Sequence, residues 1–266
     1  MKNLIDVHCH LDHERFKEDL DEVIKRAERN GVGLIIAAGI NPSTNRKILE
    51  ISKKYPIVKP SFGIYPTDAI AEKLNNLKKD ELLHEAEVFS LEKELEWIEK
   101  NYSECIAIGE VGLDYKVLPD TESLQKEAFQ KIILLAKKIK KPLIIHSRKA
   151  EADAIKLLEK NQFTRVNMHC FSAKKSLIKK CVENGYFLSV PPVITRLEHF
   201  KMLVKIVPLT QLLTETDSPF LSPVAGERNE PANIKYSIEE IAKIKEKTKE
   251  EVASRIFNNA RRLFKI

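Results

Sequence analysis

Metal-binding residue types recur at one kind of position in this 266-residue sequence, the end of a short apolar run. Four of the seven histidines and two acidic residues have this placement. Neutral imidazole and carboxylate groups are ligands that zinc, manganese, cobalt and nickel take in proteins. The pattern therefore predicts a site for two divalent cations, with the ligands His8, His10, Glu110, His146, His169 and Asp217.

The first two of these histidines, His8 and His10, are two positions apart. In a strand such residues point to the same side, so both imidazoles can hold one ion. Asp6 is expected to share this face and to accept a hydrogen bond from an imidazole N–H. The histidines without this placement are interpreted as surface residues: His13, His84 and His199.

The two acidic residues give the predicted site its chemistry. Glu110 can bridge two cations and reduce their mutual repulsion. Two cations ~3.5–4 Å apart can hold the attacking and the leaving oxygen of a displacement and lower the pKa of water toward 7. Asp217 is then both a ligand and the candidate general base. No serine near these residues lies in a nucleophile-elbow sequence, so hydrolysis without a covalent nucleophile is expected.

These side chains can meet only if the fold brings the ends of distant strands together. Short apolar runs alternate with amphipathic segments along the chain. The predicted strands are 3–8, 33–39, 57–64, 105–110, 142–147, 165–171, 185–190 and 211–217. Apolar spacing near three and four predicts helices at 16–28, 124–139, 152–158, 177–182, 200–207, 238–244 and 252–263, and more than one helix within 67–103.

This alternation predicts an α/β protein with a parallel sheet, and about 250 residues suit a (β/α)8 TIM barrel. We expect one domain over residues 1–266, with the metal site at the C-terminal ends of the strands, where barrel active sites are built. A doubly wound sheet is the alternative. Its Gly-rich phosphate turn is missing after the first strand, where the chain has HCHLDHE (8–14).

Composition limits the other function classes. The formal net charge of +6 permits a polyanionic substrate, while the basic stretches 137–141 and 243–251 are interpreted as solvated helix faces. The sequence has no apolar run of ~18 residues, and its start lacks the features of a signal peptide, so a cytoplasmic protein without a membrane span is expected. The protein is also expected to be a monomer. The cysteines form no CxxC pair, and three of them lie in apolar runs, as small buried side chains do: Cys9, Cys105, Cys170 and Cys181.

Several motifs, in this order along the whole chain, resemble those of the TatD family of metal-dependent deoxyribonucleases. They are DVHCHLD (6–12), GIYP (63–66), IGEVGLDY (108–115), HSR (146–148), HCFS (169–172), ETDSP (215–219), RNEP (228–231) and NNARRLF (258–264). The resemblance implies hydrolysis of phosphodiester bonds in single-stranded DNA, or also RNA, from the 3′ end. It implies the same six ligands, and residues near the site mouth that contact substrate or order the loop: Arg148, Arg228, Asn229 and Glu230.

The sequence departs from this family at Tyr65, where members usually have a histidine near the scissile phosphate. A phenol donates a hydrogen bond, but it titrates near 10 and is not a cationic partner for phosphate. Weaker nuclease activity or a different substrate is therefore expected. Four imidazole ligands predict bound zinc or manganese, even if magnesium supports activity, because magnesium prefers oxygen ligands.

Two other functions are compatible with these residues. The same ions can activate water in a barrel hydrolase that cleaves an amide, a lactone, a phosphotriester or the ester of a charged tRNA. The carbamylated lysine that bridges ions in many amidohydrolases has no counterpart here, since Glu110 follows the fourth predicted strand. The third possibility is a non-catalytic nucleic-acid-binding module, which would not need the complete ligand set.

Overall fold

The computed structural model describes residues 3–74 and 88–266. Within these residues eight parallel strands pair in chain order, each with the next along the sequence. The strands are β1 (Leu4–Cys9), β2 (Val32–Ala38), β3 (Val58–Phe62), β4 (Ala107–Asp114), β5 (Leu143–Arg148), β6 (Val166–Met168), β7 (Phe187–Val190) and β8 (Leu212–Thr214).

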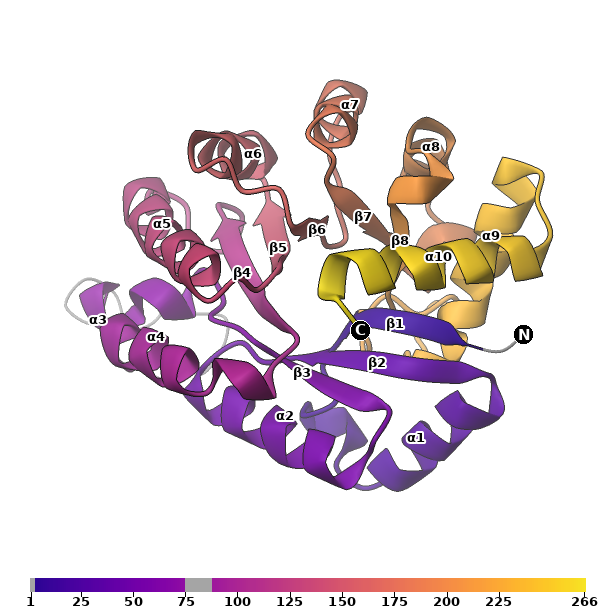
Figure 1. Ribbon diagram of the computed structural model, residues 1–266, viewed down its shortest axis with the longest axis horizontal. Helices are drawn as coiled ribbons and strands as arrows, with labels where there is room; N and C mark the ends of the chain where they lie inside the picture. The colour runs from indigo at the N-terminus through magenta and orange to yellow at the C-terminus, as the bar shows by residue number, and fades with distance from the viewer. Residues whose placement is uncertain (1–2, 75–87) are drawn as a thin grey trace.

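The first and last strands lie side by side. Oγ1 of Thr214 donates a hydrogen bond to the carbonyl of Ile5 over 2.7 Å, and the backbone N–H of Asp217 donates to the carbonyl of His8 over 2.9 Å. Helices surround the strands (Figure 1). The architecture is the predicted (β/α)8 TIM barrel, and the doubly wound alternative is wrong.

The described residues also form ten α-helices. They are α1 (Leu20–Arg29), α2 (Pro42–Lys54), α3 (Ala71–Leu74), α4 (Leu91–Lys100), α5 (Glu122–Lys138), α6 (Glu151–Lys160), α7 (Lys175–Glu183), α8 (Glu198–Ile206), α9 (Ile234–Lys245) and α10 (Lys249–Phe264). Short 3-10 helices occupy Glu14–Phe16, Asp68–Ile70, Tyr102–Glu104, Pro192–Thr195, Leu209–Gln211 and Pro231–Asn233.

Local sequence explains where two of these helices begin. Asn41 caps α2 by accepting a hydrogen bond from the backbone N–H of Thr44, and Pro42 occupies the first helical position, where it costs no hydrogen bond. At the start of α10 the side chain of Thr248 accepts a hydrogen bond from the backbone N–H of Glu251, and the side chain of Glu251 accepts one from the backbone N–H of Thr248, which is a capping box. Both helices therefore start at fixed points.

The strands contribute a second, smaller apolar cluster beside the main core. Ile5, Ile36 and Ile144, from three strands, pack in it with Leu263 and Phe264 at the end of α10. Figure 1 shows this end of α10 close to β1. The last helix therefore packs against the strands of the barrel.

Most predicted elements differ from the observed ones by one to four residues at an end, and two of these differences affect the core and the site. Phe16 lies in a 3-10 helix and the following α-helix begins only at Leu20, although Phe16 is fully buried as its apolar character predicts. β4 continues to Asp114, so Glu110 lies within the strand and not at its end. A register shift between Ile108 and Val111 in the pairing with β5 accompanies this difference. The segment 67–103 contains α3 and α4, which confirms more than one helix there.

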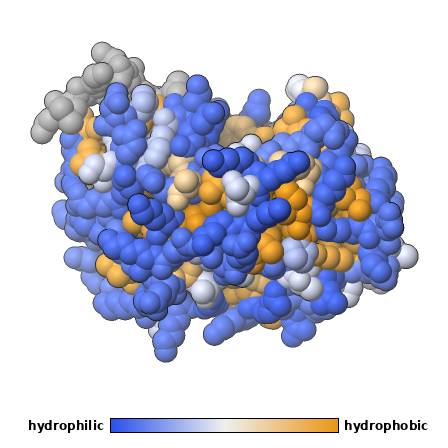
Figure 2. Space-filling model, turned by 90° about the horizontal axis from the view of Figure 1, so that it is seen from above, coloured by the Kyte–Doolittle hydropathy of each residue, from blue (hydrophilic) through white to orange (hydrophobic). Residues whose placement is uncertain are grey.

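Hydrophilic residues predominate on the face of the molecule drawn in Figure 2, with smaller hydrophobic groups between them. Among the helices that the structure describes, none combines the length and the apolar character needed to cross a membrane. Cys9, Cys105 and Cys181 are buried and Cys170 is partly buried. These four thiols are free, as expected for isolated cysteines.

Candidate metal centre

A cavity of about 540 Å³ opens where the strands end at their carboxyl side. The wall of the cavity includes five of the six predicted ligands, which are His10, Glu110, His146, His169 and Asp217. The sixth, His8, is completely buried. The structure therefore brings together side chains from β1, β4 and β5 and from the segments that follow β6 and β8.

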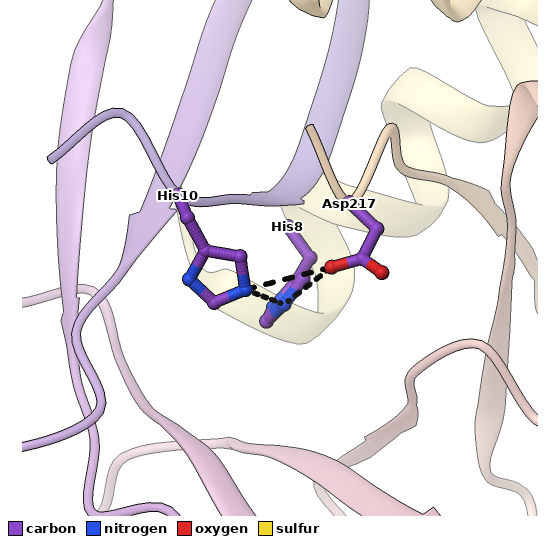
Figure 3. Close-up of side chains that lie close together, drawn as sticks. All are labelled: His8, His10 and Asp217. Carbon is purple, nitrogen blue, oxygen red and sulfur yellow. Dashed lines mark hydrogen bonds and ion pairs between the residues drawn. The ribbon is translucent and has the colours of Figure 1, made fainter. Parts of the chain in front are cut away.

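The first part of the cluster consists of His8, His10 and Asp217 (Figure 3). Nε2 of His8 lies 3.3 Å from Nε2 of His10. Oδ1 of Asp217 lies 3.5 Å from each of these two nitrogens. Three potential ligand atoms thus face one point, although His8 and Asp217 are far apart in the sequence.

Glu110 connects this group to the other two histidines. Its Oε2 lies 3.4 Å from Nε2 of His10 and 3.6 Å from Nε2 of His8. Its Oε1 lies 2.8 Å from Nδ1 of His146 and 3.7 Å from Nε2 of His169. Each oxygen of the carboxylate therefore faces a different pair of imidazoles, which is the arrangement that a bridging ligand requires.

The donor set fits divalent cations. Ligand atoms at ~2.0–2.2 Å from a zinc ion in tetrahedral geometry are ~3.3–3.6 Å from one another, and the distances around Oδ1 of Asp217 and Oε2 of Glu110 lie between 3.4 and 3.6 Å. Imidazole nitrogens and carboxylate oxygens are suitable for zinc or manganese. Two groups of three residues offer ligand atoms within 4.8 Å of one another, which are His8, His10 and Asp217, and His8, Glu110 and His169. His146 adds a nitrogen 2.8 Å from Oε1 of Glu110.

Acceptors behind the imidazoles fix their orientation. Nε2 of His146 lies 2.9 Å from Oδ2 of Asp114, and Nδ1 of His169 lies 2.7 Å from Oε2 of Glu215. Both carboxylates are fully buried. Hydrogen bonds of this kind set the tautomer of a ligating histidine and raise its basicity. Consequently Nδ1 of His146 and Nε2 of His169 are the atoms left to bind a metal.

The prediction for Asp6 is wrong. The carboxylate of Asp6 accepts hydrogen bonds from the backbone N–H groups of Thr216 and His8, over 2.8 and 3.2 Å, and from Oγ1 of Thr216. Among the described residues, Nδ1 of His8 has no hydrogen-bond partner. A register shift between Asp6 and Cys9 in the pairing with β2 interrupts the regular alternation on which the prediction relied. Asp6 instead fastens the segment before Asp217 to β1.

The side chains of the cluster shift one another's pKa values. Burial lowers the pKa of His8, but hydrogen bonds with Asp217 and Glu110 outweigh it and raise this pKa to about 9. Burial also lowers the pKa of His146, but hydrogen bonds with Asp114 and Glu110 outweigh it and raise this pKa to about 9. Burial raises the pKa of Glu110, but His10, His146 and His8 bring it well below its usual range. These shifts favour an ionised Glu110 and protonated imidazoles at neutral pH.

Metal binding should consequently release protons. An imidazole ligates only when neutral, so cations must displace the protons from His8 and His146 at neutral pH. The apparent affinity for zinc should rise between about pH 6.5 and pH 9 and fall as the pH is lowered, by up to about tenfold per pH unit for each proton displaced. Calorimetric titrations in buffers of different ionisation enthalpy measure the number of protons released. An affinity that stays constant over this range would contradict the prediction.

Tyr65 lies in the cavity wall beside the second group of ligands. Its hydroxyl donates to Oδ2 of Asp114 over 2.7 Å and lies 3.2 Å from Nε2 of His146. Burial, followed by the charges of Glu110 and Asp114, raises the pKa of Tyr65 far above its usual value. The phenol is therefore neutral and helps to hold the Asp114–His146 pair.

The four other predicted substrate residues have different environments. Arg148 is exposed at the end of β5 and lines the cavity, and its guanidinium has no ion-pair partner within residues 3–74 and 88–266. Arg228 forms two hydrogen bonds to Asp19, of 2.7 and 2.6 Å, and these bonds lower the pKa of that carboxyl to about 2. Of these two arginines, Arg148 is therefore the one placed to meet an anion at the cavity.

The loop that contains Arg228 is fastened to the protein by its neighbours as well. Glu230 pairs with Arg26 of α1 over 2.7 Å. Asn229 is fully buried and donates to the carbonyl of Thr216 over 2.8 Å. These residues were expected either to contact substrate or to order the loop. Their side chains contact protein groups and do not line the cavity, which favours the ordering of the loop: Arg228, Asn229 and Glu230.

Sequence reasoning missed three residues of the site. Asp114 lies in the same strand as Glu110, and Glu215 lies two positions before Asp217, so their alternation with known candidates was a usable signal. His13, predicted to be an ordinary surface residue, lines the cavity. His199 is partly buried, with Nε2 at 3.1 Å from the carbonyl of Phe171, and His84 lies outside the described residues.

Comparison with known proteins gives a consistent result over the whole chain. The model of the family described as TatD related DNase matches residues 5–265. The chain is 36% identical to the metal-dependent hydrolase YabD of Bacillus subtilis, covering 99% of both proteins, and 35% identical to the deoxyribonuclease TATDN3 of Homo sapiens, covering 98% of this chain and 94% of that protein. The crystal structure of YJJV, a TatD homologue from Escherichia coli, superimposes with a TM-score of 0.84 at 25% identity, covering 99% and 98% of the two chains.

Proposed function

The chain belongs to the TatD family of metal-dependent hydrolases, and we propose that it is a nuclease that cleaves phosphodiester bonds of single-stranded DNA from the 3′ end. The observation that carries the proposal is the position of Glu110, whose two carboxylate oxygens face different pairs of imidazoles. The deoxyribonuclease name of a relative that is 35% identical over nearly the whole chain supports the choice of substrate.

The six ligands would hold two divalent cations, which would provide a Lewis acid for the phosphoryl oxygens and lower the pKa of a water molecule when bound. The protein provides the rest. Glu110 fixes the distance between the two groups of ligands, while Asp114 and Glu215 keep the imidazoles of His146 and His169 oriented toward the cavity. Rigid outer contacts of this kind typically contribute 10- to 100-fold in metal affinity or activity.

Asp217 is the proposed general base. Its Oδ1 faces His8 and His10, so the second oxygen of the same carboxylate can take a proton from the attacking water. Burial raises the pKa of Asp217, but His169, His10 and His8 bring it well below its usual range, so the group is ionised at neutral pH. An ionised carboxylate within the cavity wall meets the first condition for accepting a proton there.

Arg148 is the proposed phosphate contact. Its guanidinium has no ion-pair partner among the residues that the structure describes and lines the cavity, and guanidinium binds phosphate oxygens through two parallel hydrogen bonds. Tyr65 cannot supply a positive charge in place of the histidine expected from the family, since a phenol is neutral or anionic. Among the side chains proposed to contact substrate, Arg148 therefore supplies the positive charge.

Replacing Arg148 with alanine should lower kcat/KM for single-stranded DNA by about 10- to 100-fold, since a hydrogen bond to a charged group contributes ~1.5–3 kcal/mol. The loss should appear mainly in KM, because the side chain touches no predicted ligand. Arg148→Lys keeps the charge without the paired hydrogen bonds and should lose less. Equal kcat/KM for all three proteins would remove Arg148 from the substrate site.

The function itself is tested with oligonucleotides labelled at the 3′ or the 5′ end, incubated with the protein loaded with zinc, manganese or magnesium. Shortening from the 3′ end that stops on chelation is the expected result. Turnover of a carboxylic ester, an amide or a charged tRNA without strand shortening would favour another barrel hydrolase. Binding of DNA without any metal-dependent cleavage would favour a non-catalytic module.

A further inference from the structure

An exposed aromatic side chain stands in the wall of the cavity beside the metal ligands. Phe220 is 46% exposed, although phenylalanine is usually buried. The centroid of its ring lies 6.3 Å from that of His10 and 5.4 Å from that of His13, both in T-shaped arrangements. A predicted ligand and a second imidazole therefore support an aromatic surface that faces solvent.

The backbone fixes this ring relative to the ligands. The N–H of Phe220 donates to the carbonyl of Asp217 over 2.9 Å, which closes a tight turn after the ligand. The N–H of His10 donates to the carbonyl of Ser218 over 2.8 Å, which joins the same turn to the segment after β1. Backbone hydrogen bonds therefore connect the turn that contains Phe220 to two predicted ligands, Asp217 and His10.

Both apolar and charged side chains line the cavity. Phe220 and Leu221 line it from the segment after β8, and Ile40 lines it from the segment after β2. Arg148 lines it from the end of β5, which lies opposite β1 in the order of the eight strands. The carboxylates of Asp12 and Glu151 line it as well. A substrate with a flat apolar part on Phe220 and an anionic part on Arg148 would present the group between them to the ligands.

We propose that Phe220 is the platform on which a nucleobase adjoining the scissile phosphate stacks, and that this contact places the phosphate over the ligands. The inference rests on the proposed nuclease function and specifies how that site binds its substrate. A phenyl ring stacks on any of the four bases, so the contact gives affinity and register without strong sequence preference. Arg148 then holds the backbone on the opposite side of the cleaved bond.

A combination of protein and substrate changes tests the proposal. Single-stranded oligonucleotides are prepared with an abasic nucleotide on the 5′ or on the 3′ side of the cleaved bond, and kcat/KM is measured for wild type and for Phe220→Ala. On the base-bearing oligonucleotide the variant should lose about 10- to 100-fold, the usual effect of one base–aromatic contact. Removing one of the two bases should cause a similar loss in wild type, and the two changes together should cost little more than either alone.

Two variants serve as controls. Phe220→Trp keeps an aromatic surface and should retain most of the activity on base-bearing DNA, while losing it with the abasic substrate as wild type does. Val224, 48% exposed in the same loop and absent from the cavity wall, allows Val224→Ala as a matched loss of an exposed apolar side chain, without effect on kcat/KM. Metal content, measured for every variant, monitors the ligand cluster.

The loss caused by Phe220→Ala and the loss caused by an abasic nucleotide would multiply if the two changes acted independently. If they multiplied at both abasic positions, Phe220 would touch neither base and the stacking contact would be overturned. An unchanged kcat/KM for Phe220→Ala would overturn it too. If wild type cleaves no oligonucleotide with any of the metals, the proposed function fails and the inference fails with it. These results are distinguishable, because the first two require active wild-type protein.

Discussion

Replacing Glu110 with alanine is expected to remove the second cation and with it nearly all hydrolysis. The two oxygens of Glu110 face different pairs of imidazoles, one of which includes His146, whereas Oδ1 of Asp217 lies near His8, His10 and His169. Losing an outer partner of a ligand costs about 10- to 100-fold in metal affinity, and losing a bridging ligand should therefore exceed about 100-fold. Elemental analysis after dialysis should find one cation per chain or fewer, where wild type has two.

A matched control comes from the same cavity. Glu151 also lines it, but none of the imidazole contacts described above involves this residue. Glu151→Gln should therefore retain both cations, which separates a lost ligand from a general loss of negative charge. If Glu110→Ala retained two cations, Glu110 would not be a bridging ligand. The ion near His10 and the ion near His146 would then be held independently of each other.

The strand periodicity was sufficient to predict that these six side chains lie together, because in a barrel the position of a residue along its strand determines its place in the fold. Any residue near the carboxyl end of a strand reaches one face of the barrel. His8, His146 and Asp217 could therefore be assigned to one site without knowing any contact between them. Glu110 joined the site although it lies inside β4 and not at its end, since the apolar run that precedes it marks only part of that strand.

Contacts that depend on side-chain orientation and on loops could not be predicted in the same way. Asp6 was expected at an imidazole, but its carboxylate accepts a hydrogen bond from the backbone N–H of Thr216, a residue about 200 positions later in the chain. Arg228 is a suitable phosphate ligand by composition, yet its partner Asp19 lies more than 200 positions earlier in the chain. Phe220 has no polar group that would attract notice in a sequence. Each of these roles depends on tertiary structure.

Replacing Asp217 with asparagine should lower kcat by about 10²- to 10⁴-fold, the usual contribution of a general base. The amide has nearly the same shape and keeps an oxygen for the metal, but it cannot accept a proton at neutral pH. Binding of single-stranded DNA should change little, because Arg148 is untouched. Single-turnover rates, fluorescence anisotropy with labelled DNA and metal analysis measure the three quantities on one preparation.

The comparison of these quantities decides what Asp217 does. A large loss of kcat with both cations and DNA affinity retained identifies proton transfer as the missing step, and a non-catalytic binding module is then excluded. A loss of kcat that follows the loss of a cation, and that excess metal restores, would leave Asp217 as a ligand only. Asp19→Asn, which removes a carboxylate from the Arg228 ion pair away from the cavity, is the control for effects of charge on DNA binding. Since Oδ1 of Asp217 lies within 3.9 Å of three imidazoles, the base and the ligand are one group, and only this separation of rate from metal content distinguishes its two functions.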